Sequence, residues 1–303
     1  MAGLKQIKAQ IKATDRTRKV TKAMEAVSAV KMRKSQERAL LNRRYAEAAL
    51  RMLSNVQSAP EIANSPYMIS SGHRECIVVM TSDKGLAGSL NSAVLKLVEQ
   101  YTKGKDPQNI VAVCLGRKGY EYCLRKGFDI VHYAVQISDE INTEDLAQIS
   151  DHALRAYQTS DIAKLSVFFQ NFVSTFAQEP VRREILPLSQ AVVTDMIKGI
   201  LPKTGKYSEE EVRASGTVYT LEPSSEAIFD TLVPELAHIL LYHALLETKA
   251  SEHSARMVAM KNASDNAKEV SKTLTLKFNK ARQAVITREV SEITGGMEAM
   301  AQK

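Results

Sequence analysis

The sequence predicts an α/β protein in which two long terminal helices pair as an antiparallel coiled coil, with a parallel α/β domain inserted between them. Three observations predict this fold. Gly and Pro are absent between Gly3 and Pro60, and again over 60 consecutive residues between Pro234 and Gly295. Apolar residues in both segments recur every three or four positions, which is the spacing of a helix that buries one narrow stripe. Between the two segments, short apolar runs alternate with helical patterns, as in βαβ units.

The N-terminal segment, residues 1–59, is predicted to be one long helix. Ala, Lys, Arg, Glu and Met dominate it, and all of them are good helix formers. Its apolar stripe alternates by three and four residues and then resumes after a polar interval. The predicted stripe consists of Leu4, Ile7, Ile11, Thr14, Val20, Met24 and Val27.

The C-terminal segment, residues 226–303, is predicted to be the second long helix, and its Gly- and Pro-free part alone would extend for about 90 Å. One row of its stripe has a spacing of seven residues, and Ser264 and Ser271 interrupt the other row. The stripe consists of Met257, Met260, Ala267, Leu274, Phe278, Ala281 and Val285. Because the stripe is thin and rich in small residues, we expect close pairing with the N-terminal helix over a limited length rather than a long homotypic zipper.

The insert, residues 74–222, alternates between strand-like and helix-like segments. Strands are predicted at 76–81, 110–115, 130–135 and 165–173, and helices at 92–102, 120–126 and 144–157. This alternation predicts a parallel sheet. Two later strand-like runs, 181–186 and 217–221, flank a polar segment at 198–211.

The loop after the first predicted strand, TSDKGLAGSLN at 81–91, lies where phosphate-binding loops lie in nucleotide-binding folds. It lacks the three glycines of a dinucleotide fingerprint and the GxxxxGK[ST] pattern of a P-loop. A tight turn with Asp83 and Ser89 as helix caps is the favoured interpretation. A phosphate cradle is the weaker alternative.

No catalytic or metal-binding pattern is evident elsewhere. The six histidines include no HExxH spacing, and His238 and His243 are five residues apart, which does not place them on one helix face. Cys76, Cys114 and Cys123 form no CxxC motif, so we expect them to be small buried hydrophobes in a reducing compartment. The sequence predicts no enzyme active site, no cofactor and no metal.

The positive charge is confined to one end of the chain. The whole chain has a net charge of +7, but residues 1–59 hold 14 Lys and Arg against four acids, so they carry +10 and the remainder carries −3. A basic arm of this kind binds phosphate, an anionic lipid surface or an acidic protein surface. A basic coiled coil that binds nucleic acid is therefore an alternative, although the arm offers only Tyr45 for stacking on bases.

Membrane insertion and secretion are not predicted. The longest apolar run, at 239–246, is far shorter than the ~20 residues that span a bilayer. The first residues, MAGLKQIK, lack the apolar core of a secretory signal.

Three sets of motifs, in order along the chain, resemble the F-type ATP synthase gamma subunit family. The first set is LKQIK at 4–8, IK at 11–12 and VTKAMEAVSAVKM at 20–32. The second is the loop TSDKGLAG at 81–88. The third is RMVAMKNA at 256–263, ARQAVITRE at 281–289 and EITGG at 292–296. The resemblance covers both terminal segments and the insert.

The resemblance implies a rotor shaft rather than an enzyme. In that family the two terminal helices form an antiparallel coiled coil inside a ring of alpha and beta subunits, and a Rossmann-like domain forms the foot. The implied partners are the alpha and beta subunits, the epsilon subunit and the membrane c-ring, with no nucleic acid. The implied location is the cytoplasmic face of a bacterial plasma membrane, where the protein is peripheral. ATP chemistry would belong to the beta subunits.

The resemblance also implies contact residues. The implied contacts between the shaft and the ring are Lys22, Met24, Arg256, Arg282, Gln283, Thr287 and Glu289. The segment YTLEP at 219–223 resembles the part that faces the c-ring, so Tyr219 and Glu222 are the implied contacts with the c-ring or the epsilon subunit. The same positions on an isolated coiled coil, or at the tip of an edge strand, would simply be solvated.

Overall fold

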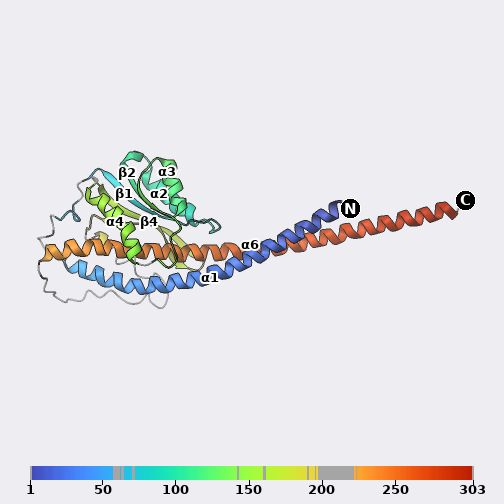
Figure 1. Cartoon of the computed structure of the whole chain (residues 1–303), viewed down its shortest axis with the longest axis horizontal. Coiled ribbons are helices and arrows are strands. Elements are labelled where there is room, and N and C mark those ends of the chain that lie inside the picture. Colours follow the sequence, from blue (N-terminus) through green and yellow to red (C-terminus); the bar gives the residue numbers. More distant parts are fainter. Residues whose placement is uncertain are drawn as a thin grey trace. The chain divides into compact units, whose positions relative to one another are not determined.

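The fold is taken from a computed structural model of the whole chain (Figure 1). The structure describes residues 2–56, 62, 65–69, 72–141, 143–159, 162–189, 191–194, 196, 222 and 224–301. The predicted strand at 217–221, the polar segment at 198–211 and Tyr219 lie outside the described residues. The chain divides into two compact units, Met1–Val27 with Met257–Lys303, and Ser28–Arg256.

Two long helices contribute to both units. Helix α1 spans Ala2–Val56 and helix α6 spans Ser225–Ala301, with lengths of 55 and 77 residues. Both cover the segments that lack Gly and Pro without a break as far as the structure describes them, which confirms the predicted helices. Helix α6 also contains Pro234 near its start. The units do not coincide with the predicted division at 1–59, 74–222 and 226–303, which stays a prediction.

The first unit is a helix pair whose buried positions follow the predicted stripe on α6. Met260, Ser264 and Ala267 are buried there, and the remaining stripe residues down to Val285 are half-buried. Ser271 Oγ donates to Asp15 Oδ1 of α1 at 3.1 Å. The two serines that interrupt the apolar row are therefore part of the helix contact, because small hydroxyl side chains let two helix backbones approach closely.

The stripe on α1 differs from the prediction after Thr14. Val20 and Val27 are 58% and 56% exposed, whereas Thr21 is only 8% exposed. The alternation by three and four residues continues from Thr14 through Arg18 to Thr21, and this phase places both valines on the outer side. The prediction for the two valines was wrong because it followed hydrophobicity and overlooked a small polar residue that keeps the phase.

The second unit contains a five-stranded sheet with helices on both faces. The strands are β1 (Arg74–Met80), β2 (Ile110–Leu115), β3 (Asp129–Ala134), β4 (Ile162–Ser174) and β5 (Ala177–Leu186). The shorter helices are α2 (Leu90–Thr102), the 3-10 turn η2 (Pro107–Asn109), α3 (Arg117–Lys126) and α4 (Thr143–Thr159). The strand order is β3-β2-β1-β4-β5. The predicted strand at 110–115 coincides with β2.

Alternate residues of the central strands point into two different cores. On one face, Ile77 and Val79 pack with residues of α2 and α3. On the other face, Cys76 and Val78 pack with α4 and with parts of α1 and α6. Continuous apolar runs are typical of strands that are covered on both faces, and this explains why the strands show no polar alternation. All three cysteines are buried and free, as predicted.

The sheet is mixed rather than wholly parallel. The pairs β1 with β2, β1 with β4 and β2 with β3 are parallel, which confirms the α/β fold class. Strand β5 pairs with β4 in the antiparallel sense. Only Thr175 and Phe176 separate these two strands, and so short a connection can form a hairpin but cannot form the crossover that a parallel pair needs.

Among the residues that the structure describes, one helix is long and apolar enough to cross a bilayer by length and composition, and it lies within α6. The best 18-residue window of that helix is 56% buried inside the protein. Residues of this helix from Phe229 to Leu245 belong to the core of the second unit. A core helix of a soluble fold passes the same test, so the finding is weak evidence for a membrane span.

Candidate functional site

Backbone contacts join the carboxyl ends of β1, β2 and β3 in the second unit. Gly116 follows β2 with φ +95°, and its N–H donates to Ala134 O at 2.8 Å. A Cβ at this position would meet the carbonyl oxygen of Thr81 at 2.0 Å. The Thr81 hydroxyl accepts from Gly119 N at 2.7 Å. Because the backbones approach this closely, only glycine fits at position 116.

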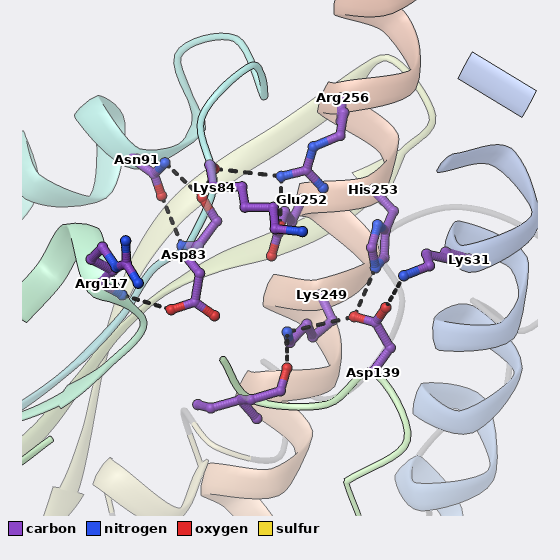
Figure 2. A network of polar contacts seen from close by, with 12 residues as sticks. Lys31, Asp83, Lys84, Asn91, Arg117, Asp139, Lys249, Glu252, His253 and Arg256 are labelled. Carbon is purple, nitrogen blue, oxygen red and sulfur yellow. Dashed lines mark hydrogen bonds and ion pairs between the residues drawn. The ribbon is translucent and has the colours of Figure 1, made fainter. Parts of the chain in front are cut away.

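The loop at 81–91 is held by its own polar side chains. Ser82 N donates to Asn91 Oδ1 at 2.9 Å, and Asn91 Nδ2 donates to Ser82 Oγ at 2.8 Å (Figure 2). Asp83 Oδ1 accepts from Arg117 N at 3.0 Å, at the start of α3. The capping prediction was therefore wrong in detail, since Asp83 caps α3 and Ser89 makes no side-chain capping bond to α2. Asp83 reaches α3 because the ends of β1 and β2 are adjacent.

A second cluster of polar contacts surrounds Asp139, in the loop between β3 and α4. Lys31 Nζ of α1 donates to Asp139 Oδ2 at 2.7 Å. From α6, His253 Nε2 lies 3.0 Å and Lys249 Nζ lies 3.5 Å from Asp139 Oδ1 (Figure 2). Arg38 of α1 donates to the backbone carbonyl of Asp139 at 2.6 Å. One carboxylate thus connects both long helices to the sheet domain.

The cluster favours the charged form of Asp139. The hydrogen bond with His253 is the largest influence on this carboxyl group and lowers its pKa; burial opposes this, and Lys31 and Lys249 add to the lowering. The net pKa lies well below the usual value for aspartate. A carboxylate held in this way stays ionised throughout the physiological range.

The basic arm predicted from the sequence is therefore partly neutralised by the chain itself. Lys31 pairs with Asp139, and Lys34 and Arg38 lie 3.9 and 4.0 Å from Glu140. These three cations are in the second unit. The cations from Lys5 to Lys22 belong to the first unit and remain largely on its surface.

A third set of contacts involves a polar segment of α6. Nearly every residue from Glu247 to Arg256 is polar, and most of them are buried. We name residues 247–256 the collar. It contacts the end of β4, the loop that carries Asp139, and the loop at 81–91, where Arg256 Nη2 donates to Lys84 O at 3.5 Å (Figure 2).

A metal site is not evident in the described part of the chain. No group of three or more His, Cys, Asp and Glu residues lies close enough together there to hold an ion. His132 and His152 stack with ring centroids 4.0 Å apart, but two imidazoles alone do not make a metal site.

One hollow of about 500 Å³ lies beside the end of α2. Its lining includes Lys96, Glu99, Lys103, Lys105, Lys126 and Phe128. Two of the four ammonium groups are already paired, Lys105 with Glu75 at 2.6 Å and Lys126 with Glu99 at 2.7 Å. The lining contains no glycine-rich nucleotide motif.

Most of the predicted shaft contacts are in the first unit. Arg282, Gln283, Thr287 and Glu289 are exposed on α6. Met24 of α1 is half-buried. Lys22 of α1 is exposed and forms an ion pair with Glu25 at 3.0 Å. Five of these six side chains therefore lie on the surface of the helix pair.

The other predicted contacts have different surroundings. Arg256 is 8% exposed and belongs to the second unit, where its guanidinium donates to Glu252 Oε1 at 2.6 Å. Its role as a contact with another subunit stays a prediction. Glu222 is exposed in a bend before α6, and Tyr219 lies outside the described residues.

Sequence reasoning missed both the collar and the Asp139 cluster. On a helix pattern, a polar run such as ETKASEHSAR at 247–256 is typical of a solvated face. One signal was available, because the run directly follows the apolar residues 239–246 and contains five small side chains, Thr248, Ala250, Ser251, Ser254 and Ala255. Small polar residues after a core helix segment permit close approach of another backbone.

The class of fold is defined by two long helices that pair with each other in one unit and are bonded to an α/β domain in the other. Comparison with known sequences identifies the family of the chain. The family described as ATP synthase matches residues 3–300. The ATP synthase gamma chain of Cupriavidus metallidurans is 38% identical over 303 residues, covering 99% of this chain and 100% of that one. The chain belongs to the ATP synthase gamma chain family.

Solved structures of ATP synthase stalks share the fold. A chain from the central stalk and c-ring of the Tetrahymena thermophila mitochondrial enzyme has a TM-score of 0.58 at 24% identity, covering 81% of this chain and 99% of that one. A chain from an OSCP/F1/c-ring structure of the Euglena gracilis mitochondrial enzyme, in rotational state 3, has a TM-score of 0.67 at 15% identity, covering 99% and 95%. The predicted fold, two long terminal helices flanking a Rossmann-like α/β domain, is confirmed.

Proposed function

We propose that this chain is the central-stalk rotor subunit of an F-type ATP synthase, which couples ion-driven rotation of the c-ring to ATP synthesis at the beta subunits and regulates ATPase activity. The observation that carries this proposal is the full-length similarity to an ATP synthase gamma chain. The two long helices and the sheet domain support it, because a shaft needs both a stiff rod and a base on which partners can act.

We further propose that the chain is not itself catalytic and that it acts through partners. These are the alpha and beta subunits, the epsilon subunit and the c-ring, at the cytoplasmic face of a bacterial plasma membrane. Relatives of the same fold come from structures described as central stalk, rotor and c-ring assemblies. Catalysis would then belong to the beta subunits.

The exposed residues of the first unit suit contact with a ring of subunits. Val20 and Val27 are more than half exposed on α1, and Ile286, Val290 and Ile293 are 46%, 54% and 64% exposed on α6. Arg282, Gln283, Thr287 and Glu289 lie among the α6 residues. A surface that alternates apolar and charged side chains can make contacts of different strength with each conformation of the ring, which any conformational coupling requires.

Co-expression with alpha and beta subunits tests this proposal. We expect the chain to co-purify with them in a complex whose ATPase activity exceeds that of alpha and beta subunits expressed without it. Assembly with the epsilon subunit, the c-ring and the stationary membrane and stator subunits of the complete enzyme should yield ATP-driven proton pumping in vesicles. Failure of the wild-type chain to co-purify would refute the assignment. A salt-dependent shift of duplex DNA or tRNA at physiological ionic strength would instead favour the nucleic-acid alternative.

A further inference from the structure

The collar, residues 247–256 of α6, differs from the rest of the helix because its buried side chains are polar. Besides Ala250, the buried residues of the collar are all polar, namely Glu247, Thr248, Ser251, Glu252, His253, Ser254 and Arg256. Buried polar groups are costly unless they are hydrogen-bonded. A helix segment that only filled space would be better served by the Leu and Ile residues found at 239–246.

One side of the collar continues the hydrogen bonding of the sheet. Strand β4 is longer than β1, and their residue pairs end at Val79–Phe168. Beyond that point Gln170 N donates to Thr248 Oγ1 at 3.4 Å, and Phe172 N donates to Glu247 Oε2 at 3.0 Å. Side chains of α6 therefore take the place of the missing strand.

Two serines extend the same contact along β4. Ser251 Oγ donates to Gln170 O at 3.2 Å, and Ser254 Oγ donates to Thr175 O at 2.6 Å. Gln178 Nε2 donates to Ser254 Oγ at 3.5 Å. The helix is thus fixed at several points to the backbone of β4 and of the turn that follows it, which sets its position along the strand.

The opposite side of the collar is bonded to two loops (Figure 2). Lys249 Nζ donates to Ile137 O at 2.8 Å and lies 3.5 Å from Asp139 Oδ1, and His253 Nε2 lies 3.0 Å from the same oxygen. Arg256 is bonded to Lys84 O. At about 100° per residue, the residues that contact these loops lie roughly opposite those that contact β4.

Contacts on opposite sides of a helix prevent two movements. Apolar packing is non-directional, so it fixes the rotation and axial position of a helix less sharply than hydrogen bonds do. Hydrogen bonds have narrow distance and angle ranges, and a buried donor or acceptor that loses its partner costs about 1–3 kcal/mol. Rolling or sliding of α6 against the sheet domain would break several such bonds together.

We propose that the collar is the joint that fixes α6 against rotation about its own axis within the sheet domain, so that torque applied to this domain is delivered to the helix without slip. The residues of the collar are then positioning residues for the coupling function. This inference rests on the proposed rotor function.

The test compares two variants in the complete ATP synthase, reconstituted in vesicles. Thr248→Ala/Ser251→Ala/Ser254→Ala removes the three hydroxyl groups through which α6 is bonded to Gln170, Thr175 and Gln178. The control, Thr231→Ala/Thr273→Ala, removes exposed α6 hydroxyls that donate to helix carbonyls at 2.9 and 3.1 Å. ATP hydrolysis and ATP-driven proton pumping are measured on the same vesicles.

We expect the triple variant to hydrolyse ATP at the wild-type rate while its pumping per ATP falls about twofold or more, because the hydrogen bonds that keep α6 from rolling against β4 are lost. The control variant should match the wild type in its rate of ATP hydrolysis and in its pumping per ATP. Unchanged pumping in the triple variant, equal losses in the control, or a parallel fall of hydrolysis and pumping would overturn the inference. If the triple variant does not assemble, the comparison of Thr248→Ala with Thr248→Ser tests the inference instead. Thr248→Ala should lower the pumping per ATP, whereas Thr248→Ser keeps the hydroxyl group and should pump like the wild type.

The wild-type complex separates the two proposals. If it does not assemble or pump, the rotor function itself fails. If it pumps and the triple variant pumps equally well, the function stands and the joint is refuted.

Discussion

The same two helices are packed differently in the two units of the molecule. In the first unit, the buried positions of α1 and α6 include Thr21, Ser264 and Ala267, and most of each helix surface is exposed. In the second unit, Leu50 and Phe229 are fully buried in a core shared with the sheet. The difference indicates that the first unit presents surface to partners, whereas the second unit holds the helices in place.

The contrast is also electrostatic. In the second unit, the cations Lys31 and Arg38 of α1 are bonded to the loop at Asp139 and Glu140. In the first unit, Lys22 pairs only with a neighbour on its own helix turn. An exposed ion pair of this kind contributes about 0–1 kcal/mol to the stability of the fold, so Lys22 remains available for an acidic partner.

The largest effect on stability should come from the core of the second unit. We expect Phe229→Ala, at a fully buried position on α6, to lower the free energy of unfolding by about 3–5 kcal/mol. Leu274→Ala, at a half-buried position of the same helix in the first unit, should cost about 1 kcal/mol because less area is buried. Urea unfolding of the purified chain measures both. Equal costs would contradict the comparison.

A smaller effect is expected at Asp139. Asp139→Asn should lower the free energy of unfolding by about 2 kcal/mol at pH 7, because charge-assisted hydrogen bonds to both long helices are weakened. The pKa of this carboxyl group is lowered in the folded state, so its contribution is complete above the unfolded pKa of about 4 and is lost as the pH falls through the lower folded pKa. The difference between wild type and variant should therefore narrow below about pH 4.

Unfolding by urea at a series of pH values checks this prediction. Asp129→Asn is a suitable control. Asp129 is an exposed residue at the start of β3, and it forms an ion pair with Arg74 at the start of β1. A gap between wild type and Asp139→Asn that stays constant from pH 7 to pH 3 would contradict the assignment.

The smallest effect on stability should be at Met24. Met24→Lys places a charge at a half-buried position of the first unit, and we expect a loss of at most about 1 kcal/mol, because the lysine stem can extend to solvent. Assembly should persist, whereas pumping per ATP should fall if Met24 bears on the ring. The test is the pumping per ATP of the variant in reconstituted vesicles. A value equal to that of the wild type would show that Met24 does not face the ring.

Periodicity predicted the regular elements well for a physical reason. The run at 110–115 is apolar throughout because β2 is buried on both faces, so its ends are marked in the sequence. The absence of Gly and Pro predicted both long helices, since either residue would weaken a helix interior. Strand β5 was predicted only from residue 181 onward, because its first half is mostly exposed and lacks an apolar pattern.

Side-chain partners across the fold were not predictable in the same way. Asp83 and Arg117 are 34 residues apart, and Asp139 and His253 are 114 apart. Such pairs depend on which strand ends and helices become neighbours, and a single sequence does not encode that locally. The collar was missed because polarity is ordinarily a sign of exposure, and here backbone groups of β4 beyond the end of β1 supply the buried partners instead.

Direct observation of rotation is the sharpest test of the central claim. The three native cysteines are buried, and burial raises the pKa of Cys76 to about 12, so a cysteine introduced as Leu124→Cys at a 60% exposed site on α3 can be labelled selectively. A bead attached there, on a complex with alpha and beta subunits that is immobilised through the beta subunits, should rotate in one direction when ATP is added. A bead that stays still while the complex hydrolyses ATP would contradict the account.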